Sequence, residues 1–581
     1  MKPQKCFRHE RVDEIPLVLG FIQQAKLAEL LDRHLESHPL HQGLSSGQLV
    51  CGWLAFLFSK SSHAKVSVQN WANSHQRTLS HFFGQPLRTV EFTDDRLTLL
   101  LRRLAKASWP ALEEDLWAVT CDVYQLSYEA VRLDGTSSYG YHETNPDGLL
   151  QFGHSKNHRP DLPQLKLMAA AAQPSSQLIA CDVAPGNSTD DVLYLPLIKR
   201  LWRQLRRSGL LYIGDCKMAA LMIRAEIVNH HDWYLMPVPN TGAHQKLIPQ
   251  WIQEAINPKA DVRKVWITDH AGKRKMIAEV YELTRSCGMQ VGEKEVRWDE
   301  RVQLVRSVEL RKKRITMLEK RLRQAVEQLR RVTPAIGPGR KQVGEESLLT
   351  AKIESVLDRH KVKGLLQVTW ECEKKEQYVG RGRPKSGTPP KKVESRRYVI
   401  TGVMRNEAAI AEEKKKLGWR VQVTNLKKEK WPSVLCVILY NDGWCVERSF
   451  HLLKDSPLGI QPLYVREEDQ IIGLTRLLLI GLRMLTLLEL QVREGLEQNE
   501  EELAGLFEGQ PTRVTDVPTA TRVLKAIARM EITLTGETTD HGEQWHLTDL
   551  PVLLTRMLVL LRLSPDLYLG LPLLSSVHNL P

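Results

Sequence analysis

The chain has 581 residues, too many for a single hydrophobic core, so several domains are expected. Its composition, with 42% hydrophobic and 26% charged residues, is that of a globular protein. A net charge of +13 favours a polyanionic partner over a membrane surface.

The nine cysteines are scattered, with no C-x-x-C pair, which argues against a zinc ribbon or a disulfide framework and favours a reducing cytosol. The N-terminal MKPQKCFRHERVDE lacks the apolar run of a signal peptide. Charged residues interrupt the two most apolar stretches, so we predict buried helices and no membrane span.

Residues 1 to about 120 are predicted to be helical. A serine near Leu44 is placed to cap a helix with an apolar face through Phe58, and a second helix follows a polar break and ends near Trp71. The two could form a helix-turn-helix, but helix pairs are common and DNA contact by this one stays open. Thr93 is placed to cap a further helix.

From about residue 127 the hydrophobic pattern changes to short apolar runs of strand length. The predicted strands are Tyr128 to Leu133, Leu165 to Ala171, Leu178 to Val183 and Leu210 to Ile213, with an amphipathic helix at Asp190 to Leu205. This order predicts an α/β domain with a mixed sheet.

Residues 241 to 430 interrupt that pattern. We predict strands at Lys264 to Ile267, Ala278 to Leu283 and Tyr398 to Val403, and a long charged helix at roughly Glu300 to Val332, as a hairpin arm or solvated helix. A basic Pro/Gly-rich stretch contains Arg381-Gly-Arg383-Pro, the core of an AT-hook that would lie in a narrow minor groove. A solvated basic linker is the alternative.

The segment up to Lys454 carries the strongest functional signal. Val434 to Tyr440 is predicted to be a buried strand, followed by a helix with Glu447, Arg448 and Lys454. Glu447 and Lys454 are about two helical turns apart and share a face, while Phe450 and Leu453 would pack inward. Such a face suits a metal ion beside a phosphodiester; an ordinary solvated helix face is the alternative.

Two aspartates follow predicted strands. Asp134 ends an apolar run before Gly135, and Asp215 comes directly after Leu210 to Ile213 and Gly214. With Glu447 they could hold two Mg²⁺ (or Mn²⁺) ions, which bind carboxylate oxygens and assist in-line displacement at phosphorus. Each aspartate alone could equally be a turn former or helix cap. No phosphate-binding P-loop is present, so no nucleotide cofactor is expected.

In this order and context Asp134, Asp215 and Glu447 resemble the DDE transposases of bacterial insertion sequences. Tyr440, position 443, Glu447 and Lys454 match the Y-(2)-R-(3)-E-(6)-K spacing of one subgroup. Gly443 replaces the signature arginine, which in the family is thought to help hold DNA phosphates. Weaker phosphate contact and substitution by Arg448 are the two alternatives.

The resemblance implies an α/β RNase H-like catalytic domain with a mixed sheet, formed by residues 121–240 and 431–490. A mostly β insertion domain at 241–430, with the long charged helix and the basic linker, would interrupt it. A helical DNA-binding region at 1–120 and a helical region at 491–581 would flank it.

The function implied is a Mg²⁺-dependent transposase that nicks element ends and joins the freed 3′-hydroxyl to target DNA. Asp134, Asp215 and Glu447 would ligate the metals, and Tyr440, Arg448 and Lys454 would position phosphates. Its partner would be double-stranded DNA, as terminal repeats and target, bound by a homodimer in the bacterial cytoplasm. A non-catalytic DNA-binding protein derived from a transposase, or a nuclease of the same fold, remain alternatives.

Overall fold

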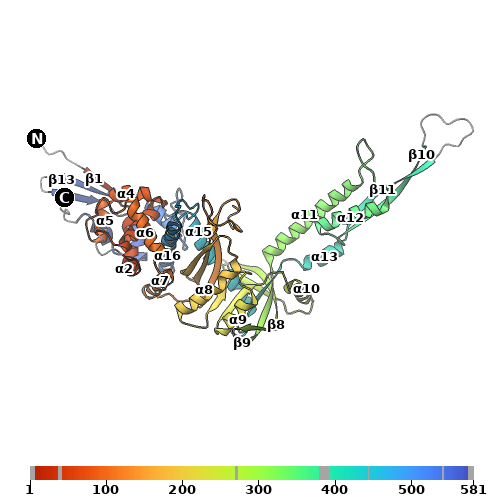
Figure 1. Ribbon diagram of the computed structural model, residues 1–581, viewed down its shortest axis with the longest axis horizontal. Coiled ribbons are helices and arrows are strands. Elements are labelled where there is room, and N and C mark those ends of the chain that lie inside the picture. Colours follow the sequence, from red (N-terminus) through yellow and green to blue (C-terminus); the bar gives the residue numbers. More distant parts are fainter. Residues whose placement is uncertain are drawn as a thin grey trace, which may run out of the picture. The chain divides into compact units, whose positions relative to one another are not determined.

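The computed structural model describes residues 7–36, 42–268, 272–378, 392–442, 444–539 and 542–573. The chain forms two compact units (Figure 1). The first contains Met1–Met236, Gly288–Arg297 and Tyr440–Pro581, and the second contains Pro237–Cys287 and Trp298–Leu439. The candidate site lies within the first unit.

The sheet of the first unit has the strand order β4-β3-β2-β5-β6. β2 pairs antiparallel with β3, which pairs antiparallel with β4, whereas β2, β5 and β6 run parallel. The strands are β2 (Ala130–Tyr139), β3 (Gln164–Gln173), β4 (Leu178–Pro185), β5 (Leu211–Ile213) and β6 (Trp233–Pro237), with helices α8 (Asp190–Leu205) and α9 (Leu221–Asn229) in the connections. This is a mixed sheet in an α/β unit.

The predicted strands and the helix at Asp190 to Leu205 are confirmed, with one correction. Asp134 does not end its strand, because β2 continues to Tyr139 and Asp134 pairs with Ala169 of β3. The sequence did not predict this continuation, because polar residues follow Asp134. Ser137 and Ser138 are fully buried, and β3 is buried at every position, so this strand is covered on both faces.

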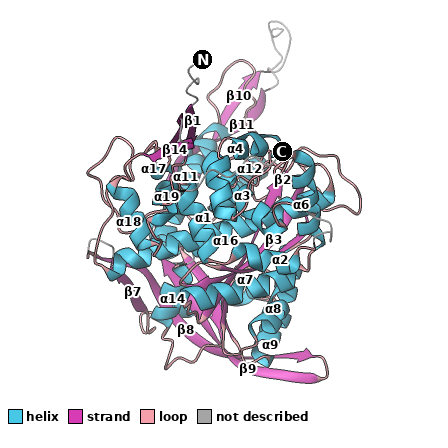
Figure 2. Cartoon of the chain, turned by 90° about the vertical axis from the view of Figure 1, so that its left-hand side faces the viewer, coloured by secondary structure: helices cyan, strands magenta, loops and turns pink. Residues whose placement is uncertain are grey.

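The remaining core of the first unit is mostly helical (Figure 2). Its long helix α16 (Glu468–Gln498) packs against α3, α6, α15 (Trp444–Lys454) and β4. The N-terminal helices are α1 (Ile15–Gln24), α2 (Leu27–His34), α3 (Ser46–Lys60), α4 (Lys65–Asn73), α5 (Gln76–Phe83), α6 (Asp94–Lys106) and α7 (Trp109–Tyr124). The predicted serine cap is confirmed, since Ser45 and Gln48 form a capping box at the start of α3.

Helix α16 is the one helix within the described residues that is long and apolar enough to cross a membrane. Of its most apolar window, 89% is buried inside the protein, and the core helix of a soluble protein passes the same test. Its apolar face is therefore explained by packing in this fold.

The terminal regions are not wholly helical, contrary to the prediction. β1 (Phe7–Arg11) pairs with β13 (Thr533–Thr539), which pairs with β14 (Gly542–Leu547). Helices α17 (Ala520–Ile527), α18 (Val552–Leu560) and α19 (Asp566–Leu569) complete the C-terminal region. The strands β1 and β13 are far apart in sequence, so no local pattern predicts their pairing.

The second unit contains a sheet with the order β12-β9-β8-β7 and a separate ribbon, β10-β11. Its elements are α10 (His244–Ala255), β7 (Arg263–Thr268), β8 (Arg274–Val291), β9 (Lys294–Ser307), α11 (Val308–Val332), α12 (Glu346–His360), β10 (Leu366–Tyr378), β11 (Lys392–Arg405), α13 (Glu407–Lys415), β12 (Trp419–Thr424) and α14 (Ser433–Asn441). The three predicted strands are confirmed within β7, β8 and β11.

Two predictions in this region need correction: the start of the charged helix, which is otherwise confirmed, and the strand at Val434 to Tyr440. Glu300 to Ser307 belongs to strand β9, so the charged helix α11 begins at Val308; it packs against α12 as a hairpin arm through Leu318, Leu322 and Leu329. Val434 to Tyr440 lies in helix α14 and is not a strand. A short apolar run fits either state, and burial of Ser433, Cys436 and Val437 has helical spacing.

The crossing of α16 and α6 permits no side chain at Gly473. An added Cβ there would lie 2.1 Å from the Leu101 carbonyl oxygen. We expect Gly473→Ala to lower the free energy of unfolding by about 2–3 kcal/mol, because backbone clash outweighs the better helix propensity of alanine. Thermal unfolding tests this, with Gly337→Ala, whose Cβ meets nothing nearer than 3.6 Å, as the control. Equal stability of both variants would contradict the close crossing.

Candidate active site

Asp134 lies within β2, and Asp215 lies two residues beyond the end of the neighbouring parallel strand β5. The last pair between β2 and β5 joins Arg132 to Ile213. Asp134 and Asp215 are each two residues farther along the chain than this pair. Since neighbouring strands are about 5 Å apart, β2 and β5 bring the two aspartates to the same region of the sheet.

Each aspartate is oriented by partners of its own. Asp134 Oδ1 accepts a 2.7 Å hydrogen bond from the Gly135 N–H and lies 3.8 Å from Lys156 Nζ. Asp215 Oδ1 accepts hydrogen bonds of 2.8 Å from the Tyr194 hydroxyl and from the Lys217 N–H. The two carboxylates are therefore each held in place, Asp134 within β2 and Asp215 just past the end of β5.

Glu447 is presented by helix α15, which packs on β2 and β3. Val446, Phe450 and Leu453 are buried beneath the helix, as predicted for the last two, and Glu447 is exposed. Burial, with the negative charges of Asp215 and Glu447, raises the pKa of Asp134 against the opposing effect of Lys156. Asp215 and Glu447 therefore both lie within electrostatic reach of Asp134.

Three lysines and an asparagine lie around these acids, and of these only Lys454 was predicted from the sequence. Lys156 lies 3.2 Å from Asp190 Oδ2, and Lys166 lies 2.6 Å from Asp190 Oδ1. Lys454 donates a 2.7 Å hydrogen bond to Asn157 Oδ1. Lys156 and Asn157 were not predicted from the sequence, because single polar residues in a loop carry no pattern.

Tyr440 and Arg448 each have a partner within the first unit. The Arg132 guanidinium lies 5.8 Å from the Tyr440 ring and donates a 3.4 Å hydrogen bond to the Tyr440 carbonyl. Arg448 forms an ion pair with Glu489 of α16, which also accepts a 3.1 Å hydrogen bond from the Ala520 N–H. Arg448 therefore ties α15 to α16.

Three positions from the sequence analysis fall outside the described residues. They are Arg381 and Arg383 of the possible AT-hook and Gly443 of the signature.

The atoms that could bind a metal ion decide whether this site suits one. Within the described ranges, no three His, Cys, Asp or Glu side chains form a ready cluster for a metal ion. The donors of Asp134, Asp215 and Glu447 are nevertheless all carboxylate oxygens, as hard divalent cations prefer. Burial is the main cause of the raised pKa of Asp134, and the charges of Asp215 and Glu447 add to it; a bound cation would favour the ionised carboxylate. These residues therefore suit a divalent metal.

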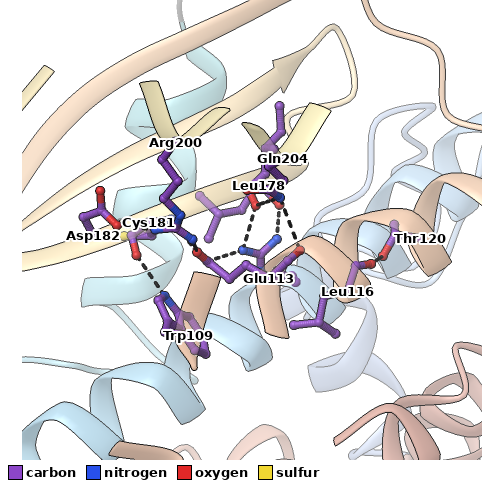
Figure 3. A network of polar contacts seen from close by, with 11 residues as sticks. Trp109, Glu113, Leu116, Thr120, Leu178, Cys181, Asp182, Arg200 and Gln204 are labelled. Carbon is purple, nitrogen blue, oxygen red and sulfur yellow. Dashed lines mark hydrogen bonds and ion pairs between the residues drawn. The ribbon is translucent and has the colours of Figure 1, made fainter. Parts of the chain in front are cut away.

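A buried charge network fixes the elements around this sheet (Figure 3). Glu113 of α7 is fully buried and forms ion pairs with Arg200 of α8 and Arg483 of α16. It also accepts a 3.1 Å hydrogen bond from the Cys181 N–H of β4, and Arg200 pairs with Asp182. The network joins three helices to the sheet edge, and none of its members was predicted.

Comparison with known proteins gives one family. A family model described as transposase DDE domain matches residues 126–482, more than half of the chain. No curated protein matches the chain. Among solved structures, a piggyBac transposase synaptic complex with hairpin DNA matches at 12% identity and a TM-score of 0.23, over 48% of this chain and 60% of that chain.

Proposed function

The chain belongs to the transposase DDE domain family, and from this we propose that it cleaves DNA at the ends of its own element and joins them to target DNA. The observation that carries the proposal is the placement of Asp134 on β2 and of Asp215 just beyond the parallel neighbour β5, with Glu447 on helix α15, which packs on β2 and β3. The strand order β4-β3-β2-β5-β6, with β5 and β6 parallel to β2, supports an RNase H-like catalytic core.

In this proposal Asp134, Asp215 and Glu447 hold two Mg²⁺ or Mn²⁺ ions. Bound ions would activate the attacking oxygen and stabilise the leaving oxygen of an in-line displacement. The protein's own part is positional: Tyr194 and the Lys217 N–H fix Asp215, and the Gly135 N–H fixes Asp134. Lys156, beside Asp134, would otherwise balance the charge of the free acids.

Phosphates of the bound strand would be held by Lys454 and Tyr440 beside the acids. Lys454 is half-buried next to Asn157, and Tyr440 lies against Arg132. Arg448, already paired with Glu489, supports the proposal chiefly by fixing the helix that carries Glu447. Arg381 and Arg383 would add minor-groove contacts, and a homodimer would bridge two element ends.

The test is a cleavage and joining assay on a DNA fragment that carries the gene's own flanks, with Mg²⁺. A transposase releases the ends and joins them to a second DNA. Cleavage without joined products would instead indicate a nuclease of the same fold. DNA binding without cleavage, and independent of divalent metal, would indicate a non-catalytic relative.

Protonation of Lys454 is expected to make DNA affinity depend on pH. Burial, followed by the positive charge of Lys156, lowers the pKa of Lys454 to about 8. Its ammonium group is charged below that pH and neutral above it, so DNA affinity should fall as pH rises through about 8. The measurement is DNA affinity in EDTA across this range.

Lys454→Arg is the matched control, because arginine stays charged and should abolish the pH dependence. Lys454→Ala should make the salt dependence of log K less steep by about 0.9, the value of one phosphate contact. An unchanged salt slope in Lys454→Ala would contradict the contact.

A further inference from the structure

A cationic pocket in the C-terminal region is formed by Phe507, Glu508, Arg522, Lys525 and Arg529. Its cavity of about 330 Å³ lies between helix α17 and the loop that precedes this helix. Arg522 and Lys525 are three residues apart and share one face of α17, and Arg529 follows in the turn that ends the helix. All three residues are exposed and line the same cavity, so their positive charges face one space.

The loop on the other side of the cavity holds an aromatic ring against two arginines. Leu503 and Thr515 pair through backbone hydrogen bonds of 2.9 and 3.2 Å, which close this loop at its base. The guanidinium carbons of Arg522 and Arg513 lie 4.4 and 3.9 Å from the centre of the Phe507 ring. The ring therefore orients two guanidinium groups without neutralising either charge.

Positive charge exceeds negative charge in the pocket. Glu508 contributes a carboxylate to the lining and pairs with Arg529 at 2.7 Å. Arg522 stacks on the neutral Phe507 ring, and Lys525 forms no ion pair within the part of the chain that the structure describes. Cations that share a cavity without matching carboxylates attract an anionic ligand.

One buried carboxylate ties this pocket to the helix that carries Glu447. Glu489 of α16 pairs with Arg448 of α15 and accepts a 3.1 Å hydrogen bond from the Ala520 N–H at the start of α17. Helices α15 and α17 both pack on α16. The pocket therefore belongs to the same packed group of helices as the proposed active site.

We propose that the cationic pocket binds a backbone phosphate of the DNA on which the three acids act. Guanidinium and ammonium groups form charge-assisted hydrogen bonds with phosphate oxygens. An arginine that stacks on an aromatic ring keeps the N–H groups at its edge available for such bonds. The proposal rests on the proposed function in naming DNA as the polyanion, and it adds a contact in the C-terminal region that the acids do not require.

The affinity for a duplex taken from the gene's own flank, measured in EDTA over a range of salt concentrations, tests the pocket. Lys525→Ala should make the slope of log K against log salt less steep by about 0.9, the value of one phosphate contact, and should bind about eight-fold more weakly at about 0.1 M salt. Arg522→Ala should show the same changes. Thermal unfolding should not change, because both residues are exposed.

Lys199→Ala is the matched control for the loss of one positive charge. Lys199 is an exposed lysine on α8, and its 2.7 Å ion pair with Glu226 already balances its charge. Its salt slope should therefore equal that of wild type. Unchanged slopes in Lys525→Ala and Arg522→Ala would overturn the pocket, as would an equal change in the control.

The carboxylate of the pocket provides a change of opposite sign. Glu508→Gln removes the charge that pairs with Arg529, so this variant should bind the duplex more tightly and with a steeper salt slope. Glu502→Gln removes an exposed carboxylate outside the lining and should bind like wild type. Equal affinities of these two variants would contradict phosphate binding at Arg529.

Acetylation of lysines, measured by mass spectrometry, shows whether DNA occupies the pocket itself. Bound duplex should protect Lys525 from acetylation, and Arg522→Ala should reduce this protection. Inorganic phosphate is the second probe, because a free anion offers the same chemistry as a DNA phosphate. Protection by inorganic phosphate with none by DNA would indicate a small-anion site and overturn the assignment to DNA.

The result is separable from the outcome for the proposed function. Asp215→Asn should protect Lys525 on binding DNA as wild type does, since the pocket needs neither metal nor catalysis. Protection of Lys525 in a wild-type protein that never cleaves DNA would support the pocket and contradict the transposase proposal. Cleavage by a wild-type protein whose Lys525 reacts equally with and without DNA would do the reverse.

Discussion

Asp215→Asn lowers DNA strand cleavage by at least about 1000-fold, equal to about 4 kcal/mol of transition-state stabilisation, and leaves DNA binding intact. The substitution keeps the shape that accepts the Tyr194 hydroxyl but removes the charge that would hold a divalent cation. Single-turnover cleavage and a gel-shift titration measure the two effects separately. Asp134→Asn is expected to behave in the same way, because Asp134 lies on β2, next to the strand β5 that leads to Asp215.

Asp191→Asn is the matched control for both. Asp191 is an exposed carboxylate in the first turn of α8, directly after Asp190. Its loss should leave cleavage unchanged. A near-wild-type rate in Asp215→Asn, with the control also active, would remove the carboxylate from the chemistry.

Glu113→Ala destabilises the first unit by about 3–5 kcal/mol, the usual cost of breaking a buried ion pair by removing one partner. The substitution leaves Arg200 with Asp182 alone and leaves the Arg483 guanidinium, 5% exposed, without its carboxylate. Because α16 and α8 both depend on this network, catalysis should be lost at temperatures that wild type tolerates. Denaturant unfolding followed by circular dichroism measures the change.

Glu114→Ala is the internal reference. Glu114 is the next residue along α7, but its ion pair with Arg206, at 2.9 Å, is exposed to solvent. Pairs of that kind contribute less than about 1 kcal/mol. If Glu113→Ala and Glu114→Ala were equally stable, the network in Figure 3 would not be what holds α7, α8 and α16 together.

The apolar periodicity of the sequence correctly predicted those helices and strands that a local pattern marks. The strands around Leu165 to Ala171 and the helix from Asp190 to Leu205 follow from apolar periodicity and were found as predicted. Val434 to Tyr440 was assigned to a strand because seven apolar residues satisfy either geometry; tertiary packing of Cys436 and Val437 decides for helix α14.

Local sequence patterns could not predict contacts between residues that are far apart in the chain. The pairing of Phe7 with Glu537 brings together chain ends that no motif connects. The same applies near the site, where the partner of Lys454 is Asn157 and the partner of Arg448 is Glu489. The sequence proposed Asp134, Asp215 and Glu447 through family resemblance, and their catalytic role stays a prediction.

The measurement that tests the central claim most directly is anomalous X-ray scattering from Mn²⁺ in crystals of the protein bound to DNA. The claim is that Asp134, Asp215 and Glu447 form one divalent-metal site. We expect anomalous peaks between these three carboxylates and the loss of those peaks in Asp215→Asn. Mn²⁺ bound elsewhere on the chain, with these carboxylates bare beside an ordered DNA strand, would contradict it.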